Sequence, residues 1–118
     1  MKLVKAYIRE DVLEDVYVAM RNEGFNCVTV TQVEGTGSHR IPEHEHSSMV
    51  FPANHTEIIK LELVCRAERV EPLIELIRRN AYTGYEGDGI IYVSPVERAV
   101  PIGNEEPETY INEQDGEA

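Results

Sequence analysis

The order of apolar patterns along the chain predicts a single α+β domain of the ferredoxin-like βαββαβ type, with an antiparallel sheet and both helices on one face. Two observations lead to this prediction. Strand and helix patterns run as strand, helix, strand and again as strand, helix, strand, with a long polar excursion between the two halves. The length of 118 residues is also sufficient for one domain with a modest hydrophobic core.

The first half of the chain contains a strand, a helix and a second strand. Residues 2–8 form a short apolar run that suits a strand. Residues 11–23 place apolar side chains at helical spacing, and Gly24 follows as a stop signal. Residues 25–33 alternate and are rich in β-branched side chains, which predicts the second strand.

The second half repeats this order. Residues 56–65 alternate apolar and polar side chains, which predicts a strand with one buried face. Residues 68–81 have helical spacing, and Pro72 lies near enough to the helix start to be tolerated. Residues 90–96 form the last strand, entered directly from a cluster of glycines. The face of the sheet away from the helices is then uncovered, so we expect copies of the chain to associate through it.

Composition and charge exclude several classes of protein. Lys and Arg number 11 against 22 Asp and Glu, a net charge of −11 that repels nucleic acid and anionic membrane surfaces. No apolar run is long enough for a signal peptide or a membrane span, so we expect a cytoplasmic protein without membrane insertion. Cys27 and Cys65 lie in alternating apolar segments, where they are expected to be small buried hydrophobes. Residues 104–118 carry six acidic and no basic residues, which predicts a flexible acidic tail.

Two blocks of sequence resemble the P-II family of trimeric signalling proteins. "TVTQVEGTG" at 29–37 resembles the second strand of that family leading into its T-loop, and "TGYEGDGIIYVSPVERA" at 83–99 resembles its nucleotide-binding B-loop and fourth strand. The resemblance covers residues 1–103 as one domain. It implies a T-loop at about 38–55, a B-loop at 83–89 and a C-loop at about 99–104.

The resemblance implies a homotrimer that holds an adenine nucleotide between two subunits. Glycines of the B-loop would present backbone N–H groups to the phosphates, a close approach that only glycine allows cheaply. The alternative explanation for the glycines is a helix C-cap followed by a turn. The residues that the resemblance assigns to the nucleotide are Thr29, Gly35, Gly37, Glu62, Val64, Gly87, Asp88, Gly89 and Ile90.

Several departures from the family pattern remove positive charge from this site. Ile90 stands where a lysine is usual, Pro101 and Gly103 stand for two C-loop arginines, and Ile58 stands for a lysine before the core of the third strand. Each lost cation removes a charge-assisted contact to a polyphosphate, about 1.5–3 kcal/mol. We therefore expect ADP, AMP or another less charged adenine ligand to compete well with ATP, or ATP sensing to be lost. Arg98 is a remaining candidate cation, although an ordinary surface arginine is the alternative.

Two further departures concern the T-loop. Phe51 occupies the place of the tyrosine that is uridylylated in regulated family members, and His39 occupies that of a common glutamine. Without a phenolic oxygen the modification cannot occur at position 51. These differences indicate a divergent branch with another input signal.

All four histidines, His39, His44, His46 and His55, lie within residues 39–55. An extended backbone would place His44 and His46 on one side, where they could share a divalent transition metal such as Zn, Ni or Co. The alternatives are a solvated polar loop and a loop that senses protons.

These observations favour a binding protein over an enzyme, since no nucleophile lies beside a base and no carboxylate pair is evident. The leading hypothesis is a P-II-like regulator that binds ADP, AMP or ATP and controls a transporter or metabolic enzyme through its T-loop. The alternative is a metal-responsive trimer that uses the histidine-rich loop 39–55. A trimeric scaffold without a ligand is a third hypothesis.

Overall fold

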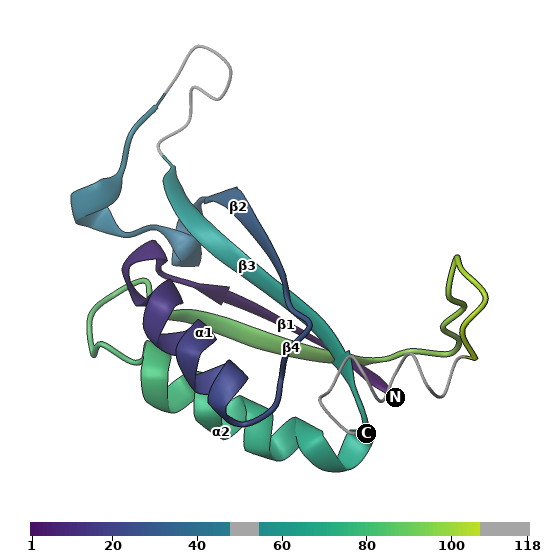
Figure 1. Ribbon diagram of the computed structural model, residues 1–118. Helices are drawn as coiled ribbons and strands as arrows, with labels where there is room; N and C mark the ends of the chain where they lie inside the picture. The colour runs from purple at the N-terminus through teal and green to yellow at the C-terminus, as the bar shows by residue number, and fades with distance from the viewer. Residues whose placement is uncertain (48–54, 107–118) are drawn as a thin grey trace.

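The computed structural model describes residues 1–47 and 55–106, and its fold is the predicted α+β arrangement (Figure 1). Two helices lie on one face of a four-stranded sheet, which confirms the βαββαβ topology. The main elements are β1 (Lys2–Ile8), α1 (Leu13–Asn22), β2 (Thr29–Gly35), β3 (Thr56–Cys65), α2 (Val70–Ala81) and β4 (Gly89–Pro95).

The sheet has the strand order β2-β3-β1-β4, and every neighbouring pair is antiparallel. In the middle of the sheet Val4 lies opposite Leu63 on β3 and opposite Val93 on β4. Because side chains alternate along each strand, this register places one apolar row of β1, β3 and β4 toward the helices, whereas the corresponding row of β2 contains Gln32 and Glu34. β2 and β4 are the two edge strands.

The core lies between the sheet and the helices. It contains side chains from both central strands and from one face of each helix, among them Val4, Ala6, Leu61, Leu63, Val16, Met20, Leu73 and Ile77. Phe25 is buried with them, and the guanidinium of Arg69 lies 4.0 Å from the centre of its ring. Cys65 is fully buried, whereas Cys27 is half-buried.

The element boundaries differ from the sequence prediction at the start of β2, at the starts of both helices and, by one residue, at β4, which was predicted at 90–96. β2 begins at Thr29 instead of residue 25 and continues to Gly35, because Phe25 turns into the core before the strand begins. Each helix is preceded by a 3-10 turn, Glu10–Val12 before α1 and Ala67–Arg69 before α2. Pro72 lies in the first turn of α2, where its missing N–H has no helical partner to lose.

The excursion between β2 and β3 is partly described. It contains the 3-10 turns Gly37–His39 and Pro42–His44, and an isolated β-bridge joins His46 to His55. Phe51 and most of the acidic segment fall outside the described residues, so predictions about them stay predictions. Among the helices of 1–47 and 55–106, none is long and apolar enough to cross a membrane.

Candidate functional site

The glycine cluster forms a turn between α2 and β4 that is ordered by Asp88. One carboxylate oxygen of Asp88 accepts hydrogen bonds from the backbone N–H groups of Thr83 and Gly84, both at 3.0 Å. The other oxygen accepts a short hydrogen bond from the Thr83 hydroxyl, whose oxygen in turn accepts the N–H of Tyr85 at 3.1 Å. A single aspartate thus holds the whole first half of the turn.

The surroundings of Asp88 favour its charged form. Partial burial by itself would raise its pKa, but the hydrogen bonds from the Thr83 side chain and from the two backbone N–H groups outweigh burial. The positive charge of Arg9 acts in the same direction, and the pKa of Asp88 is lowered from its ordinary value. The turn therefore contains a carboxylate that stays ionised at neutral pH.

Two glycines of this turn approach other backbone segments. Gly89 has a φ of +114°, and a Cβ atom there would lie 1.8 Å from the carbonyl oxygen of Tyr7 on β1. Gly87 has a φ of +91°, and its Cβ would lie 2.7 Å from the carbonyl oxygen of Arg40 and 2.8 Å from the Ile41 side chain. Both positions need glycine for packing within the protein, and their assignment to phosphates remains a prediction.

Arg9 connects this turn to the loop after β2. Its side chain is 6% exposed and donates hydrogen bonds to the Glu86 carbonyl oxygen (3.2 Å), the Glu43 carboxylate (3.2 Å) and Asp11 (3.3 Å). Burial by itself would lower the pKa of Arg9, but the hydrogen bonds and charges of Glu43 and Asp11 outweigh burial and raise it. The sequence reasoning missed Arg9, because one arginine beside acidic residues is typical of a solvated surface.

The loop after β2 is anchored at Ile41. The Thr56 hydroxyl oxygen accepts the N–H of Ile41 at 3.0 Å and donates to its carbonyl oxygen at 3.3 Å. Both residues are at most 1% exposed. The beginning of the excursion is therefore packed against the start of β3, and Ile41 lies next to Gly87.

The residues predicted to hold a nucleotide separate into two groups at opposite ends of the sheet. Gly35 lies opposite Thr56, whereas Thr29 lies opposite Glu62, six residues farther along β3. Strand geometry puts these two positions about 20 Å apart. The first group contains Gly35, Gly37, Gly87, Asp88, Gly89 and Ile90, and the second contains Thr29, Glu62 and Val64. Within one copy of the chain, the two groups cannot surround the same small ligand.

A groove with a volume of about 770 Å³ lies where α2 ends and β4 begins. Asp88, Gly89 and Ile90 form one wall, and Arg78, Arg79 and Tyr82 come from the end of α2. These arginines bring positive charge near the turn. Arg78 and Arg79 are not distinguishable in the sequence as site residues, because basic residues are common in the last turn of a helix.

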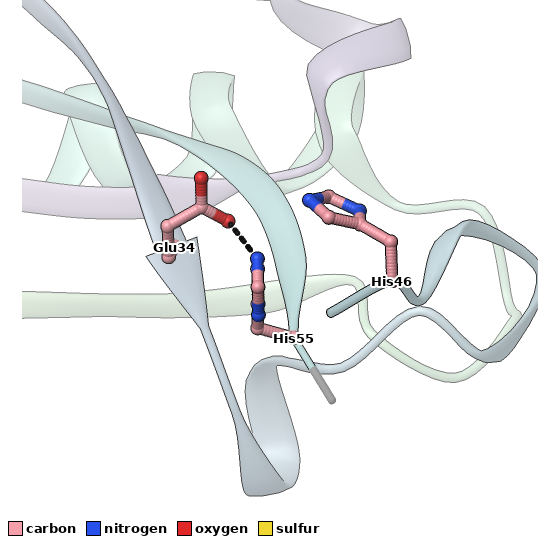
Figure 2. Close-up of side chains that lie close together, drawn as sticks. All are labelled: Glu34, His46 and His55. Atoms are coloured by element: carbon pink, nitrogen blue, oxygen red, sulfur yellow. Dashed lines mark ion pairs between the residues drawn. The ribbon is translucent and has the colours of Figure 1, made fainter. Parts of the chain in front are cut away.

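The structure brings two of the four predicted histidines together with a carboxylate that the prediction did not include. Figure 2 shows Glu34 from the end of β2, His55 from just before β3, and His46, whose ring points toward the other two. Candidate ligand atoms of the three residues lie within 4.8 Å of one another. His39 and His44 are not part of this cluster; the ring of His39 lies 5.3 Å from that of Tyr7.

Comparison with known proteins gives a match over almost the whole described chain. The family model for "Nitrogen regulatory protein P-II" matches residues 1–106. The nitrogen regulatory protein P-II of Microchaete diplosiphon is 33% identical over 109 residues, which cover 92% of this chain and 97% of that protein. The nitrogen regulatory protein GlnK of Escherichia coli (strain K12) is 30% identical over 102 residues, 86% of this chain and 91% of that protein.

The nitrogen regulatory protein GlnK2 of Haloferax mediterranei is 34% identical over 102 residues, which cover 86% of this chain and 83% of that protein. The matched regions include both the glycine turn and the excursion after β2.

Proposed function

Because this chain belongs to the P-II family of nitrogen regulatory proteins, we propose that it is a cytoplasmic regulator that binds ADP, AMP or ATP between two subunits of a homotrimer. The bound nucleotide controls a partner protein, a transporter or metabolic enzyme, through the loop 38–55. The observation that carries this proposal is the family match over residues 1–106, which spans the glycine turn and the excursion. The role is binding, without catalysis.

The two halves of the glycine turn have different roles, and this difference supports phosphate binding. Asp88 and Thr83 order the first half of the turn through the N–H groups of Thr83, Gly84 and Tyr85. The second half, 87–90, contains two glycines with positive φ and begins β4 at the groove beside Arg78 and Arg79. We assign the phosphates to this half, where glycine lets the backbone approach an anion closely.

The separation of the predicted ligands into two groups supports a site between copies. A nucleotide that contacts Gly87 in one copy can reach Thr29, Glu62 or Val64 only if a second copy presents the opposite end of its sheet. The face of the sheet away from the helices carries exposed apolar side chains, Ile90 at 44% and Tyr92 at 52%. Burial of such side chains favours association.

Arg9 and Gly87 provide a physical route from the nucleotide to the loop. Arg9 joins the Glu86 carbonyl oxygen to Glu43 in the excursion, and Gly87 packs on the backbone of Arg40. A ligand that shifts the turn therefore changes the positions available to residues 40–43. Nucleotide binding can shift the loop from one arrangement to another only if the nucleotide binds more tightly to one of the two arrangements.

Calorimetric titration of the trimeric protein with ADP, AMP and ATP tests the proposal. Saturable binding is expected, with ATP no tighter than ADP. Replacing Ile90 by lysine restores the cation of the family pattern and is expected to raise ATP affinity by about 10–100-fold. Val18→Lys adds the same charge to the exposed face of α1 and is the matched control. No binding of any nucleotide, before or after Ile90→Lys, would overturn the proposal.

A further inference from the structure

We propose that Glu34, His46 and His55 form a binding site for a divalent transition metal of the zinc, nickel or cobalt class (Figure 2). The three residues come from separate segments: the end of β2, the excursion, and the residue before β3. The site lies at the base of the excursion.

The distances between the ligand atoms fit a first-row metal. His55 Nε2 lies 3.3 Å from Glu34 Oε2. Two ligands bound at about 2.0–2.1 Å in a tetrahedral site lie about 3.3 Å apart, so this pair already has the required separation. The candidate atom of His46 lies within 4.8 Å of both, and His46 is exposed, so a modest rotation of its side chain completes the set.

The backbone around the histidines holds them in place for this role. The main chains of His46 and His55 exchange two hydrogen bonds, of 2.9 and 2.8 Å, and their ring centres lie 4.3 Å apart. His46 Nδ1 lies 3.4 Å from the His44 carbonyl oxygen. With the Nδ1 proton directed at that oxygen, Nε2 is left to bind the metal, which is the usual arrangement of a histidine ligand.

The donor set selects the class of metal. Two imidazoles and one carboxylate suit zinc, nickel or cobalt, whereas calcium and magnesium prefer sites made of oxygen. Three protein ligands leave a coordination position open for water or for a side chain of a partner. His55 is 2% exposed and Glu34 lies at the surface, so one side of the site is closed and the other faces solvent.

A metal at this site would join both arms of the loop. Glu34 precedes the excursion, and His46 and His55 lie on either side of residues 47–54. A bound ion would restrict the relative motion of the arms, and so would change what the loop presents to a partner. This consequence for signalling depends on the proposed function, whereas metal binding itself does not.

Titration of the metal-free trimeric protein with Zn²⁺ and with Co²⁺ tests the site. We expect one ion per chain, with visible absorption bands of Co²⁺ bound by nitrogen and oxygen. His46→Ala and Glu34→Gln are each expected to weaken Zn²⁺ binding by more than about tenfold. His44→Ala is the matched control, because it removes an imidazole two residues away and keeps the backbone carbonyl that His46 faces.

Two results would overturn the proposal: no saturable binding of either ion, or equal loss of binding in His44→Ala and His46→Ala. Both test variants change exposed residues, so they are expected to fold, and circular dichroism is the check. An ADP titration of His46→Ala separates the two proposals, since nucleotide affinity is expected to stay within about twofold. In the unsubstituted protein, saturable Zn²⁺ binding without any nucleotide binding would count against the proposed function and leave the metal site standing.

Discussion

The glycine turn and the loop after β2 meet at one end of the sheet, and they are held by different means. The turn is ordered by Asp88 through hydrogen bonds to residues four and five positions before it. The loop is held by Arg9 and Thr56, 34 and 15 residues away from their contacts at Glu43 and Ile41. A local motif and a long-range assembly therefore form neighbouring parts of one candidate site.

The two regions therefore depend on different interactions. In the turn, backbone conformation decides what fits, because Gly89 and Gly87 have positive φ and close neighbours. In the loop, the side chains of Arg9 and Thr56 supply hydrogen bonds to Glu43 and to the backbone of Ile41. We therefore expect that adding a single carbon atom to a glycine destabilises the turn. Removing a polar group is expected to destabilise the loop.

The largest expected effect is that of Gly89→Ala. Its Cβ would lie 1.8 Å from the Tyr7 carbonyl oxygen at a φ of +114°, so β4 must move away from β1. We expect a loss of more than about 3 kcal/mol in the free energy of unfolding, measured by urea denaturation. Gly24→Ala is the control, since it has a φ of +89° but no neighbour nearer than 3.8 Å, and should cost about 1–2 kcal/mol. Equal losses would show that φ alone matters.

The second effect is that of Thr56→Val in the loop anchor. The substitution keeps the shape but leaves the buried N–H group of Ile41 unsatisfied, whereas the Ile41 carbonyl oxygen keeps the hydrogen bond from the His44 N–H at 2.8 Å. The expected loss of stability is about 1–3 kcal/mol. Thr29→Val on the exposed end of β2 is the control and should change stability by less than about 0.5 kcal/mol. A similar loss in both variants would contradict a special role for Thr56.

Arg9→Met tests the connection between the two regions. It removes the hydrogen bonds to the Glu86 carbonyl oxygen and to Glu43 while keeping an apolar stem. Hydrogen exchange at 40–46 and 84–88 should quicken by about tenfold, with the core strands less affected. Uniform acceleration across β1 and β3 would mean that Arg9 supports the whole fold and not this connection.

The smallest expected effect is the pH dependence due to Asp88. Because its pKa is lowered in the folded protein, its stabilising contribution is fully present above the ordinary value of 3.8 and is lost as pH falls through the lower folded-state pKa. Asp88→Asn should flatten the acid side of the stability curve, measured by urea denaturation from pH 5 down to pH 2. Unchanged slopes would exclude Asp88 as a source of the acid sensitivity.

The fold could be predicted from the sequence because its signals are local. β1 and β3 follow alternating apolar residues, and β3 has the predicted bounds, Thr56–Cys65. The start of β2 was predicted four residues too early, since the alternation of 25–28 resembles a strand whereas Phe25 packs into the core. Alternation alone does not distinguish an extended segment that pairs from one that does not.

The candidate sites were less predictable because they depend on pairing between distant residues. Glycine spacing indicated the turn, but the contacts of Gly87 with Arg40 and of Gly89 with Tyr7 follow from the sheet register. The four histidines indicated a candidate metal site in the excursion, but in the structure only His46 and His55 cluster with Glu34. His39 and His44 precede that pair in the sequence and are not part of the cluster, and the ring of His39 lies beside that of Tyr7.

The bridge between His46 and His55 has a consequence for engineering. Its two backbone hydrogen bonds bring the ends of residues 47–54 together, so the cost of closing this segment depends only weakly on its length. Each doubling of a closed loop costs about 0.6 kcal/mol in chain entropy. The position between these histidines is therefore a natural insertion point, where a fluorescent peptide or an affinity tag could be placed without disturbing the sheet.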